Sequence, residues 1–320
     1  MREKFVIRLF LAPIAGITKS PFRKLIGRDN VIDYAYTEMI SGVALYHLDP
    51  KALSLIDIAP DESSVGVQLV GGDPVKMAEG AKIAERWGAS SIDINMGCPA
   101  RKILKSDGGA KLLLDLDRAL KVFSKVREAV TIPVSVKLRK GWRGRETFLE
   151  LSKVLEREGV SWITLHARYV EDGSEGPVDW GSIRRLKEEI SVPVIGNGGV
   201  NKAEDALAMV EFTKCDGVML ASGVLRNPFL PRQIRELESK GYYTKESSLD
   251  RINWLLDFCH EVKSLYGDDK GAKYVKAIIP WILRDMSSSS WLRGYILRLG
   301  SLSSMMEVLV SVKSKMGRGE

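Results

Sequence analysis

The feature that most constrains the fold is an alternation of short β-rich runs with helical patterns. The β-rich runs lie at residues 6–13, 33–39, 64–71, 91–97, 133–140, 162–168, 193–199 and 216–222. Helical patterns separate most of them; within residues 116–130 apolar side chains recur every three or four positions, with Asp117 as the expected N-cap. Eight strands alternating with helices predict an α/β fold, the (β/α)8 TIM barrel, because a doubly wound sheet usually stops at about five or six strands.

The rest of the chain shows no strand pattern. It contains helical stretches such as "DRINWLLDFCHEVKSLYG" and "WLRGYILRLGSLSSMMEVLVSV". We therefore expect two domains, a barrel over residues 1–238 and a small helical domain over residues 239–320.

Composition excludes several classes of protein. The 320 residues, 45% of them hydrophobic, are enough for a large buried core. Three cysteines without CxxC or CxxH spacing indicate neither a disulfide framework nor a zinc site, so we expect no metal. Arg8 interrupts the apolar N-terminal stretch, and no run of 18 apolar residues occurs, so we expect a cytoplasmic protein without a membrane segment.

Polar residues are predicted inside the barrel, near the carboxyl ends of five strands. Side chains of a barrel strand alternate between the interior and the surrounding helices. From this alternation, five polar side chains are predicted to point inward: Gln68, Asn95, Lys137, His166 and Asn197. A barrel interior is otherwise packed with branched apolar residues, and burying an unpaired lysine costs several kcal/mol. We therefore expect a polar ligand across the top of the barrel.

Glycine turns after the last two strands predict a phosphate site. The chain reads "GNGGV" after the seventh strand and "ASGVLRNP" after the eighth. Glycines let backbone N–H groups approach an anion, and barrels commonly bind phosphate at this place. Tight turns alone would also explain the glycines. Together with the inward polar side chains, they indicate a flat, phosphorylated cofactor such as FMN.

Cys98 directly follows the fourth strand, at the mouth of the barrel, and precedes Pro99. An isolated cysteine is more often a small buried hydrophobic residue. At this position it suits a proton donor instead, since an ordinary thiol, with a pKa of about 8.5, is mostly protonated at neutral pH. Cys215 and Cys259 lie outside the mouth and are interpreted as structural.

Cations surround the same mouth. Arg101, Lys102, Lys105 and Lys111 follow the fourth strand, against the single acid Asp107. A solvated loop would explain them, but the net charge of +7 also permits an anionic partner. The helical domain adds cations interspersed with aromatic residues, a combination that suits a structured RNA with one exposed base.

These motifs make the chain similar to the tRNA-dihydrouridine synthases. The resemblance covers nearly the whole barrel in family order. It runs through "APIAGITKSPFR", "TEMISG", "VQLVGGDP", "DINMGCPARKILKSDGGAKLL", "PVSVKLRKGW", "ITLHAR", "PVIGNGGV" and "DGVMLASGVLRNPF".

The resemblance implies an FMN enzyme that reduces the C5=C6 bond of uridines in tRNA, with NADPH as reductant. It implies that Cys98 is the acid that protonates C5. From its inward position just before the loop, we expect Asn95 to bind the edge of the base, and from their charge at the mouth we expect Arg101, Lys102 and Lys105 to contact the RNA. The implied flavin contacts are Pro13, Ile14, Ala15, Gln68, Lys137 and His166, and at the phosphate Asn197, Gly198, Gly199, Ala221 and Ser222. The family usually carries Gly-Arg-Gly where this chain has Ala221, Ser222 and Gly223, so an arginine near the phosphate is missing.

Three alternatives stay open at this point. A flavin barrel that reduces a small pyrimidine or enone would use the same ring and Cys98. A Schiff-base aldolase could use the inward Lys137. A non-catalytic RNA-binding protein would explain the cations but leave the inward polar side chains without a role.

Overall fold

The computed structural model describes residues 6–173, 176–284, 286 and 289–317. The chain forms two compact units. The first comprises the residues up to 20, residues 32–200 and residues 204–221; the second comprises residues 21–31, residues 201–203 and those from 222 onward.

The first unit is a closed barrel of eight parallel strands. They are β1 (Arg8–Leu11), β2 (Tyr34–Tyr36), β4 (Val65–Val70), β5 (Ser91–Met96), β6 (Val134–Arg139), β9 (Ile163–His166), β10 (Val194–Asn197) and β11 (Gly217–Leu220). Neighbours pair in that order, β1 also pairs with β11, and β2 with β4, so the ring is closed. Each strand lies inside one of the eight predicted runs, which confirms the TIM barrel.

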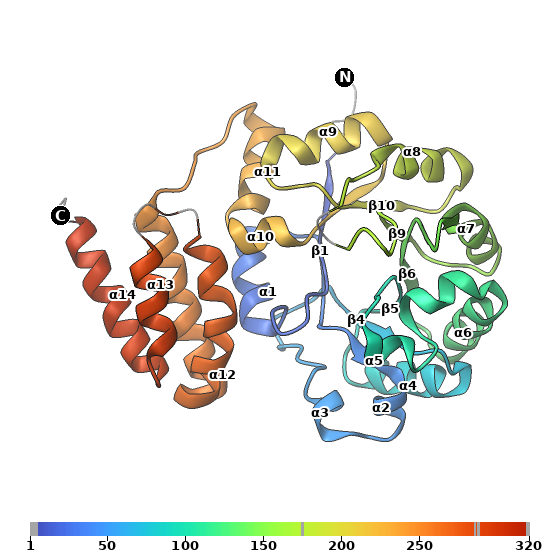
Figure 1. Ribbon diagram of the computed structural model, residues 1–320, viewed down its shortest axis with the longest axis horizontal. Coiled ribbons are helices and arrows are strands. Elements are labelled where there is room, and N and C mark those ends of the chain that lie inside the picture. The colour runs from blue at the N-terminus through green and yellow to red at the C-terminus, as the bar shows by residue number, and fades with distance from the viewer. Residues whose placement is uncertain (1–5, 174–175, 285, 287–288, 318–320) are drawn as a thin grey trace. The chain divides into compact units, whose positions relative to one another are not determined.

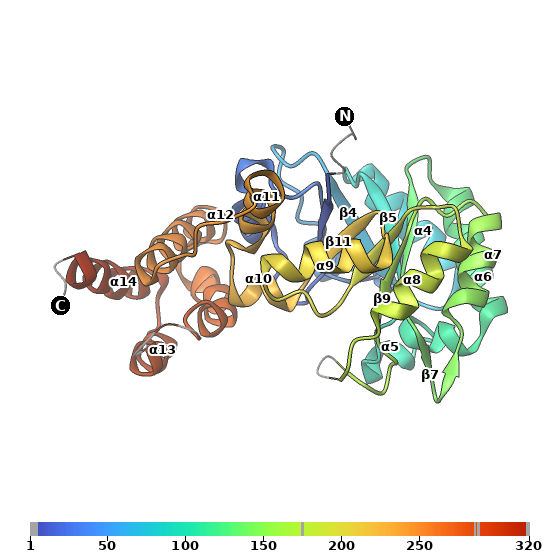
Figure 2. The same ribbon diagram turned by 90° about the horizontal axis from the view of Figure 1, so that it is seen from above.

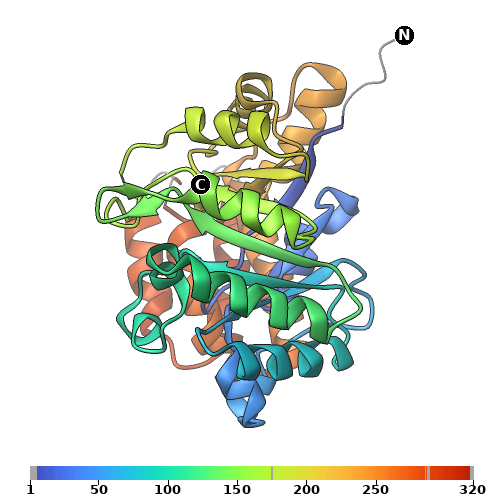
Figure 3. The same cartoon turned by 90° about the vertical axis from the view of Figure 1, so that its right-hand side faces the viewer.

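Helices cover the outside of the barrel, as Figure 1 shows and Figure 3 presents from their outer side. The long ones are α4 (Pro74–Arg86), α6 (Leu116–Ala129), α7 (Phe148–Arg157), α8 (Trp180–Glu189) and α9 (Ala203–Thr213). Short segments at the loops are α2 (Gly42–Tyr46), α3 (Pro50–Leu53), α5 (Arg101–Leu104), β3 (Ile40–Ser41) and the hairpin of β7 (Gly141–Trp142) and β8 (Arg145–Glu146). Two 3-10 turns span Arg28–Asn30 and Gly109–Leu114.

The predicted N-cap of α6 is wrong. The carboxylate that accepts the backbone N–H of Arg118 belongs to Asp115, whose own backbone is not helical. Asp117 is the second residue of the helix and lies in its first turn, where its negative charge faces the positive end of the helix dipole. Both aspartates precede the same apolar periodicity, so the pattern alone does not separate them.

The barrel interior divides into an apolar part and a polar part. Phe10, Ala12, Tyr36, Ile195 and Met219 form a buried cluster contributed by β1, β2, β10 and β11. The polar part comes from β4, β5, β6 and β9, where the strand register places Gln68 beside Asp93, Asp93 beside Ser135, and Asn95 beside Lys137. Because inward positions alternate along each strand, the polar part extends to the carboxyl ends of these strands.

The second unit is helical. It contains α1 (Ser20–Ile26) from Pro21 on, α10 (Ser222–Arg226), α11 (Leu230–Lys240), α12 (Ser248–Ile282), α13 (Ser289–Arg298) and α14 (Leu302–Gly317). The packing of α12 against α14 is visible in Figures 1 and 2. The ring of Phe22 in α1 lies edge-on to the rings of Trp254 and Phe258 in α12. Among the described residues, no helix combines the length and apolarity needed to cross a membrane.

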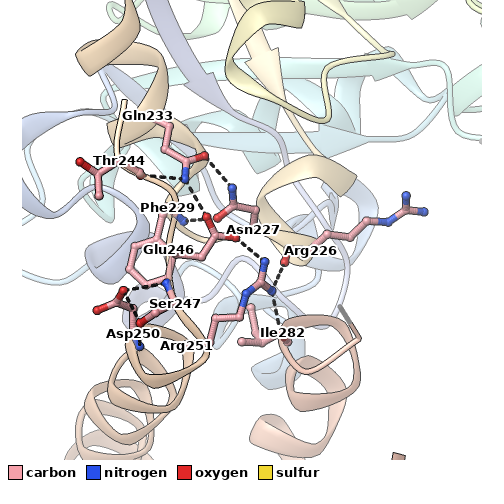
Figure 4. Close-up of polar contacts among 10 residues, drawn as sticks. All are labelled: Arg226, Asn227, Phe229, Gln233, Thr244, Glu246, Ser247, Asp250, Arg251 and Ile282. Carbon is pink, nitrogen blue, oxygen red and sulfur yellow. Dashed lines mark hydrogen bonds and ion pairs between the residues drawn. The ribbon is translucent and has the colours of Figure 1, made fainter. Parts of the chain in front are cut away.

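A buried ion pair joins the helices of this unit (Figure 4). The Arg251 guanidinium donates to the carbonyl oxygens of Arg226 (2.7 Å) and Ile282 (2.8 Å) and to the carboxylate of Glu246. The same carboxylate accepts a 2.7 Å bond from the amide of Gln233. Arg251 therefore connects the end of α10 with both ends of α12.

From Ser222 onward the chain belongs without interruption to the second unit. The predicted domain boundary between residues 238 and 239 stays a prediction.

Candidate active site

The structure brings the inward polar residues of β4, β5, β6 and β9 together. The carboxylate of Asp93 is fully buried and accepts two bonds of 2.6 Å, from the Gln68 amide and from the Ser135 hydroxyl. The Gln68 carbonyl oxygen in turn accepts a 2.9 Å bond from the amide nitrogen of Asn95. Three strands are thus connected by side-chain hydrogen bonds beneath the mouth of the barrel.

Asn95 connects this network to the segment that carries Cys98. Its carbonyl oxygen accepts the backbone N–H groups of Gly97 (3.0 Å) and Cys98 (2.9 Å). Both ends of the Asn95 amide are therefore engaged inside the protein. One N–H of the amide remains, and its predicted contact with a base stays a prediction.

Burial raises the pKa of the Asp93 carboxyl to about 6, against the opposing effect of its bonds from Ser135 and Gln68 and of the nearby Lys137. The group is therefore mostly ionised at neutral pH and acts as an acceptor only, which agrees with the two donors that face it.

Lys137 is a partly buried cation that points into the same space. It makes no hydrogen bond or ion pair with any residue that the structure describes. Burial, and next the charge of Arg139, lower the pKa of Lys137 to about 8, while the charge of Asp93 opposes the shift. An unpaired ammonium group in a partly buried site suits a ligand with an electron-rich or anionic edge.

His166 is neutral and has a defined tautomer. Burial, followed by the charges of Lys137, Arg139 and Arg168, lowers the pKa of His166 to about 2. The Arg168 guanidinium lies 3.0 Å from Nε2 of His166. Because a guanidinium only donates, Nε2 must be the acceptor, and the proton must sit on Nδ1.

Arg139 and Arg168 are held by backbone carbonyls near the site. Arg139 donates to the carbonyl oxygens of Tyr169 (2.9 Å) and Gly173 (2.7 Å), and Arg168 donates to that of Gly176 (2.7 Å). These bonds fix two cations beside the barrel mouth.

The predicted phosphate turn requires glycine. Gly198 and Gly199 have φ angles of +111° and +82°, in the region that favours glycine. A Cβ on Gly198 would lie 3.1 Å from the His166 ring and 3.2 Å from the Arg168 guanidinium, so the backbone approaches both side chains closely. The Asn197 amide donates to the Met219 carbonyl oxygen (2.8 Å), which ties this turn to β11.

The other predicted cofactor contacts lie at the ends of β1 and β11. Pro13 and Ile14 are half-buried and Ala15 is exposed, in a turn where the Ile14 N–H donates to the Thr18 hydroxyl (3.0 Å). Ala221 packs beside the apolar cluster after β11. Ser222 is exposed and begins α10 in the second unit, so its predicted phosphate contact stays a prediction.

Cys98 is the accessible cysteine of the described chain. It is partly exposed, whereas Cys215 and Cys259 are fully buried. Its carbonyl oxygen accepts the N–H of Ala110 (3.0 Å), and a Cβ on Gly109 would come within 2.5 Å of that oxygen. The loop after Cys98 therefore folds back tightly onto the cysteine.

The cations after β5 fall into two groups. Lys111 pairs with Asp107, which also pairs with Arg118 at 3.0 Å. Arg101, Lys102 and Lys105, on α5 and just after it, are exposed, and the described part of the chain offers them no ion pair. This second group is free to contact an anionic partner.

Sequence reasoning passed over Arg168 and gave Asp93 no role. His166 and Arg168 are two positions apart at the end of β9, so the alternation that selected His166 also selects Arg168. Asp93 lies two positions before Asn95 and shares its inward face, but its hydrogen bonds depend on side-chain rotamers that the alternation does not specify.

These residues fit a flat, phosphorylated cofactor of the FMN kind. Lys137 provides a free cation, His166 an Nδ1–H donor, and the glycine turn after β10 a close backbone approach. In addition, the hydroxyl of Thr164 is buried and has no hydrogen-bond partner among the described residues. A polar ligand across the mouth would give these groups hydrogen-bond partners.

Comparison with known proteins identifies the family of the chain. Residues 10–315 match the family model described as dihydrouridine synthase. The chain is 35% identical to tRNA-dihydrouridine synthase B of Pasteurella multocida over 281 residues, 87% of this chain and 84% of that protein. It is 32% identical to tRNA-dihydrouridine synthase B of Proteus vulgaris over 305 residues, 94% of each.

Among solved structures, the barrel resembles histamine dehydrogenase from Rhizobium sp. 4-9, with a TM-score of 0.55 and 15% identity. The match covers 79% of this chain but only 49% of that protein, and at this identity it shows the fold alone.

Proposed function

The chain belongs to the dihydrouridine synthase family, a family of FMN-dependent oxidoreductases, and we propose that it reduces the C5=C6 bond of uridine in tRNA. The observation that carries this proposal is the combination of an unpaired Lys137, the accessible Cys98 beside it, and exposed cations on the following helix.

The barrel mouth would hold FMN. Lys137 and the Nδ1–H of His166 would face the ring, while the backbone at Gly198 and Gly199 would approach the phosphate. Pro13, Ile14, Ala15, Gln68, Asn197, Ala221 and Ser222 complete the proposed contacts. When bound, the cofactor supplies a hydride for C6 of the uracil, and NADPH is the proposed source of that hydride.

Cys98 would supply the proton. Saturation of C5=C6 leaves negative charge at C5, which must be protonated. The thiol belongs to a loop whose backbone is fixed by Asn95 and Ala110, so its position relative to the base is constrained. Asn95 would also contact the base edge through its remaining N–H.

Arg101, Lys102 and Lys105 would bind tRNA phosphates beside Cys98. The target uridine would leave its stack to reach the barrel mouth, because a base that stays stacked inside an RNA helix could not reach the inward side chains. The helical unit would bind tRNA through its own cations. We expect the protein to act in the cytoplasm, where its substrate is found.

A flavin enzyme for a small pyrimidine is the alternative, and it is not favoured. It accounts for Lys137 and Cys98 but leaves the exposed cations of α5 without a partner. The two relatives described above are named tRNA-dihydrouridine synthases, and they match 87% and 94% of this chain.

The test is substrate discrimination by the purified protein loaded with FMN. Incubation with NADPH and unmodified tRNA should form dihydrouridine, detected by mass spectrometry of the digested RNA. Free uracil, uridine and a short single-stranded RNA should react at least about 100-fold more slowly, because they lack the phosphate contacts of folded tRNA. Equal rates for tRNA and free uridine would favour the small-pyrimidine alternative.

A further inference from the structure

The hydrogen bonds beneath the barrel mouth all point in one direction. We call Asp93, Gln68 and Asn95 the amide chain. From the surface inward, the N–H groups of Gly97 and Cys98 donate to Asn95, Asn95 donates to Gln68, and Gln68 donates to Asp93. Each step has a donor–acceptor distance between 2.6 and 3.0 Å.

The direction is set at both ends of the chain. The backbone N–H groups of Gly97 and Cys98 only donate, so the Asn95 oxygen faces them and the Asn95 NH2 group faces the Gln68 oxygen. The NH2 group of Gln68 then points inward and needs an acceptor, which Asp93 provides. Without that acceptor, Gln68 would gain by reversing its amide, and the reversal would oppose the direction that the backbone requires.

The far end of the chain acts on the thiol segment. If Asn95 turned its NH2 group toward the backbone, donors would face donors, and the N–H groups of Gly97 and Cys98 would lose their acceptor. Such a contact costs about as much as a lost hydrogen bond in a buried place, and the backbone would move away from it. The position of Cys98 is thus coupled to a carboxylate that it does not touch.

We propose that Asp93 is a positioning residue, whose buried carboxylate is the acceptor that completes the amide chain at its inner end and thereby helps to hold the Cys98 backbone in place. The proposal rests on the proposed function only for the role of the thiol as acid. The hydrogen bonds of the segment itself are made entirely within the protein.

The test moves the carboxylate along the chain. Asn95→Asp alone places two carboxylates around the single amide of Gln68. The new carboxylate, nearer the mouth, should turn to solvent and release the N–H groups of Gly97 and Cys98. In the double variant Asp93→Asn/Asn95→Asp, every bond can be remade with the Gln68 amide reversed. The amide placed at position 93 donates to Gln68, Gln68 donates to the carboxylate at position 95, and that carboxylate accepts the two backbone N–H groups.

The readout is the rate at which iodoacetamide alkylates Cys98 in the folded protein without FMN or RNA. Mass spectrometry assigns the site, and Cys215 and Cys259 are buried. We expect Asn95→Asp and Asp93→Leu to raise the rate about tenfold, the effect of one lost buried hydrogen bond. Asp93→Asn and the double variant should stay within about threefold of the wild type, because an acceptor remains at the required places.

Ser135→Ala is the matched control. It removes a bond to Asp93 of the same 2.6 Å length that lies outside the amide chain, so the alkylation rate should not change. The proposal is overturned if the double variant reacts as fast as Asn95→Asp, or if Ser135→Ala matches Asp93→Leu. Should Asp93→Leu not fold, the comparison of Asn95→Asp with the double variant decides. Failure of the proposed function would leave these rates untouched and appear only as absent dihydrouridine formation by the wild type.

Discussion

Removing the charge of Lys137 should stabilise the protein when it contains no FMN. Lys137 is held partly buried without a hydrogen bond or ion pair among the described residues, so its ammonium group is less stable in the folded protein than in the unfolded chain. Lys137→Met keeps the length of the side chain and removes the charge. The same variant should weaken FMN binding or slow flavin reduction, because the proposed partner of the cofactor ring is gone.

The magnitude follows from the pKa of Lys137. Burial lowers it from 10.5 to about 8. Because a tenfold change in proton affinity is worth about 1.4 kcal/mol, the charged side chain costs about 3 kcal/mol of stability at neutral pH. The unfolded chain binds this proton more tightly, so stability rises as the pH increases from about 8 to about 10.5. The advantage of Lys137→Met should therefore be about 3 kcal/mol near pH 7 and at most about half of that near pH 9.5.

The assay is the free energy of unfolding in urea, measured for both proteins without FMN at the two pH values. Lys121→Met, on the exposed face of α6, is the matched control and should have no effect beyond about 0.5 kcal/mol. An equal advantage of Lys137→Met at both pH values would attribute it to packing rather than charge. If Lys137→Met were no more stable than the wild type at either pH, the charged Lys137 would not destabilise the folded protein and the reasoning would be refuted.

Three further perturbations test other parts of the account. Charge reversal of Arg101, Lys102 and Lys105 to glutamate should weaken tRNA binding at least about tenfold and reduce its salt dependence while FMN binding is unchanged; a filter-binding titration with equal affinity would show that the loop is only solvated. Arg168→Met should lower FMN affinity, since its guanidinium lies against Gly198 in the proposed phosphate turn; an unchanged fluorescence titration would remove Arg168 from the phosphate end. Arg251→Met should destabilise the helical unit by about 3 to 5 kcal/mol in thermal unfolding, because it leaves a buried carboxylate unpaired; wild-type stability would show that the carboxylate reaches water.

The barrel could be predicted from the sequence because its parallel strands produce two independent sequence patterns. Short apolar runs alternate with segments of helical periodicity, and the side chains within each run alternate between the two faces of the strand. Gln68, Lys137 and His166 were therefore assigned to the interior from their positions alone, and the structure places them there.

Other features depend on contacts that no local pattern contains. The amide chain depends on an acceptor at Asp93 and on backbone donors at its other end, and the pairing of Lys111 with Asp107 separates Lys111 from its three free neighbours. The course of α12 is another case. The φ of +72° at Gly267 breaks its helical backbone, and the chain turns back there, since Arg251 near the start of α12 reaches the carbonyl of Ile282 at its end.

The central claim is tested most directly by the dihydrouridine content of tRNA from cells that lack this gene. Liquid chromatography with mass spectrometry of tRNA fragments should show that one or more uridine positions lose dihydrouridine. The wild-type gene should restore them, whereas Cys98→Ala should restore them about 10²- to 10⁴-fold more slowly, the usual contribution of a positioned general acid. Full dihydrouridine at every position in the deleted strain, in the absence of another enzyme for the same sites, would contradict the proposed function. Restoration by Cys98→Ala at the wild-type rate would contradict the role of the thiol.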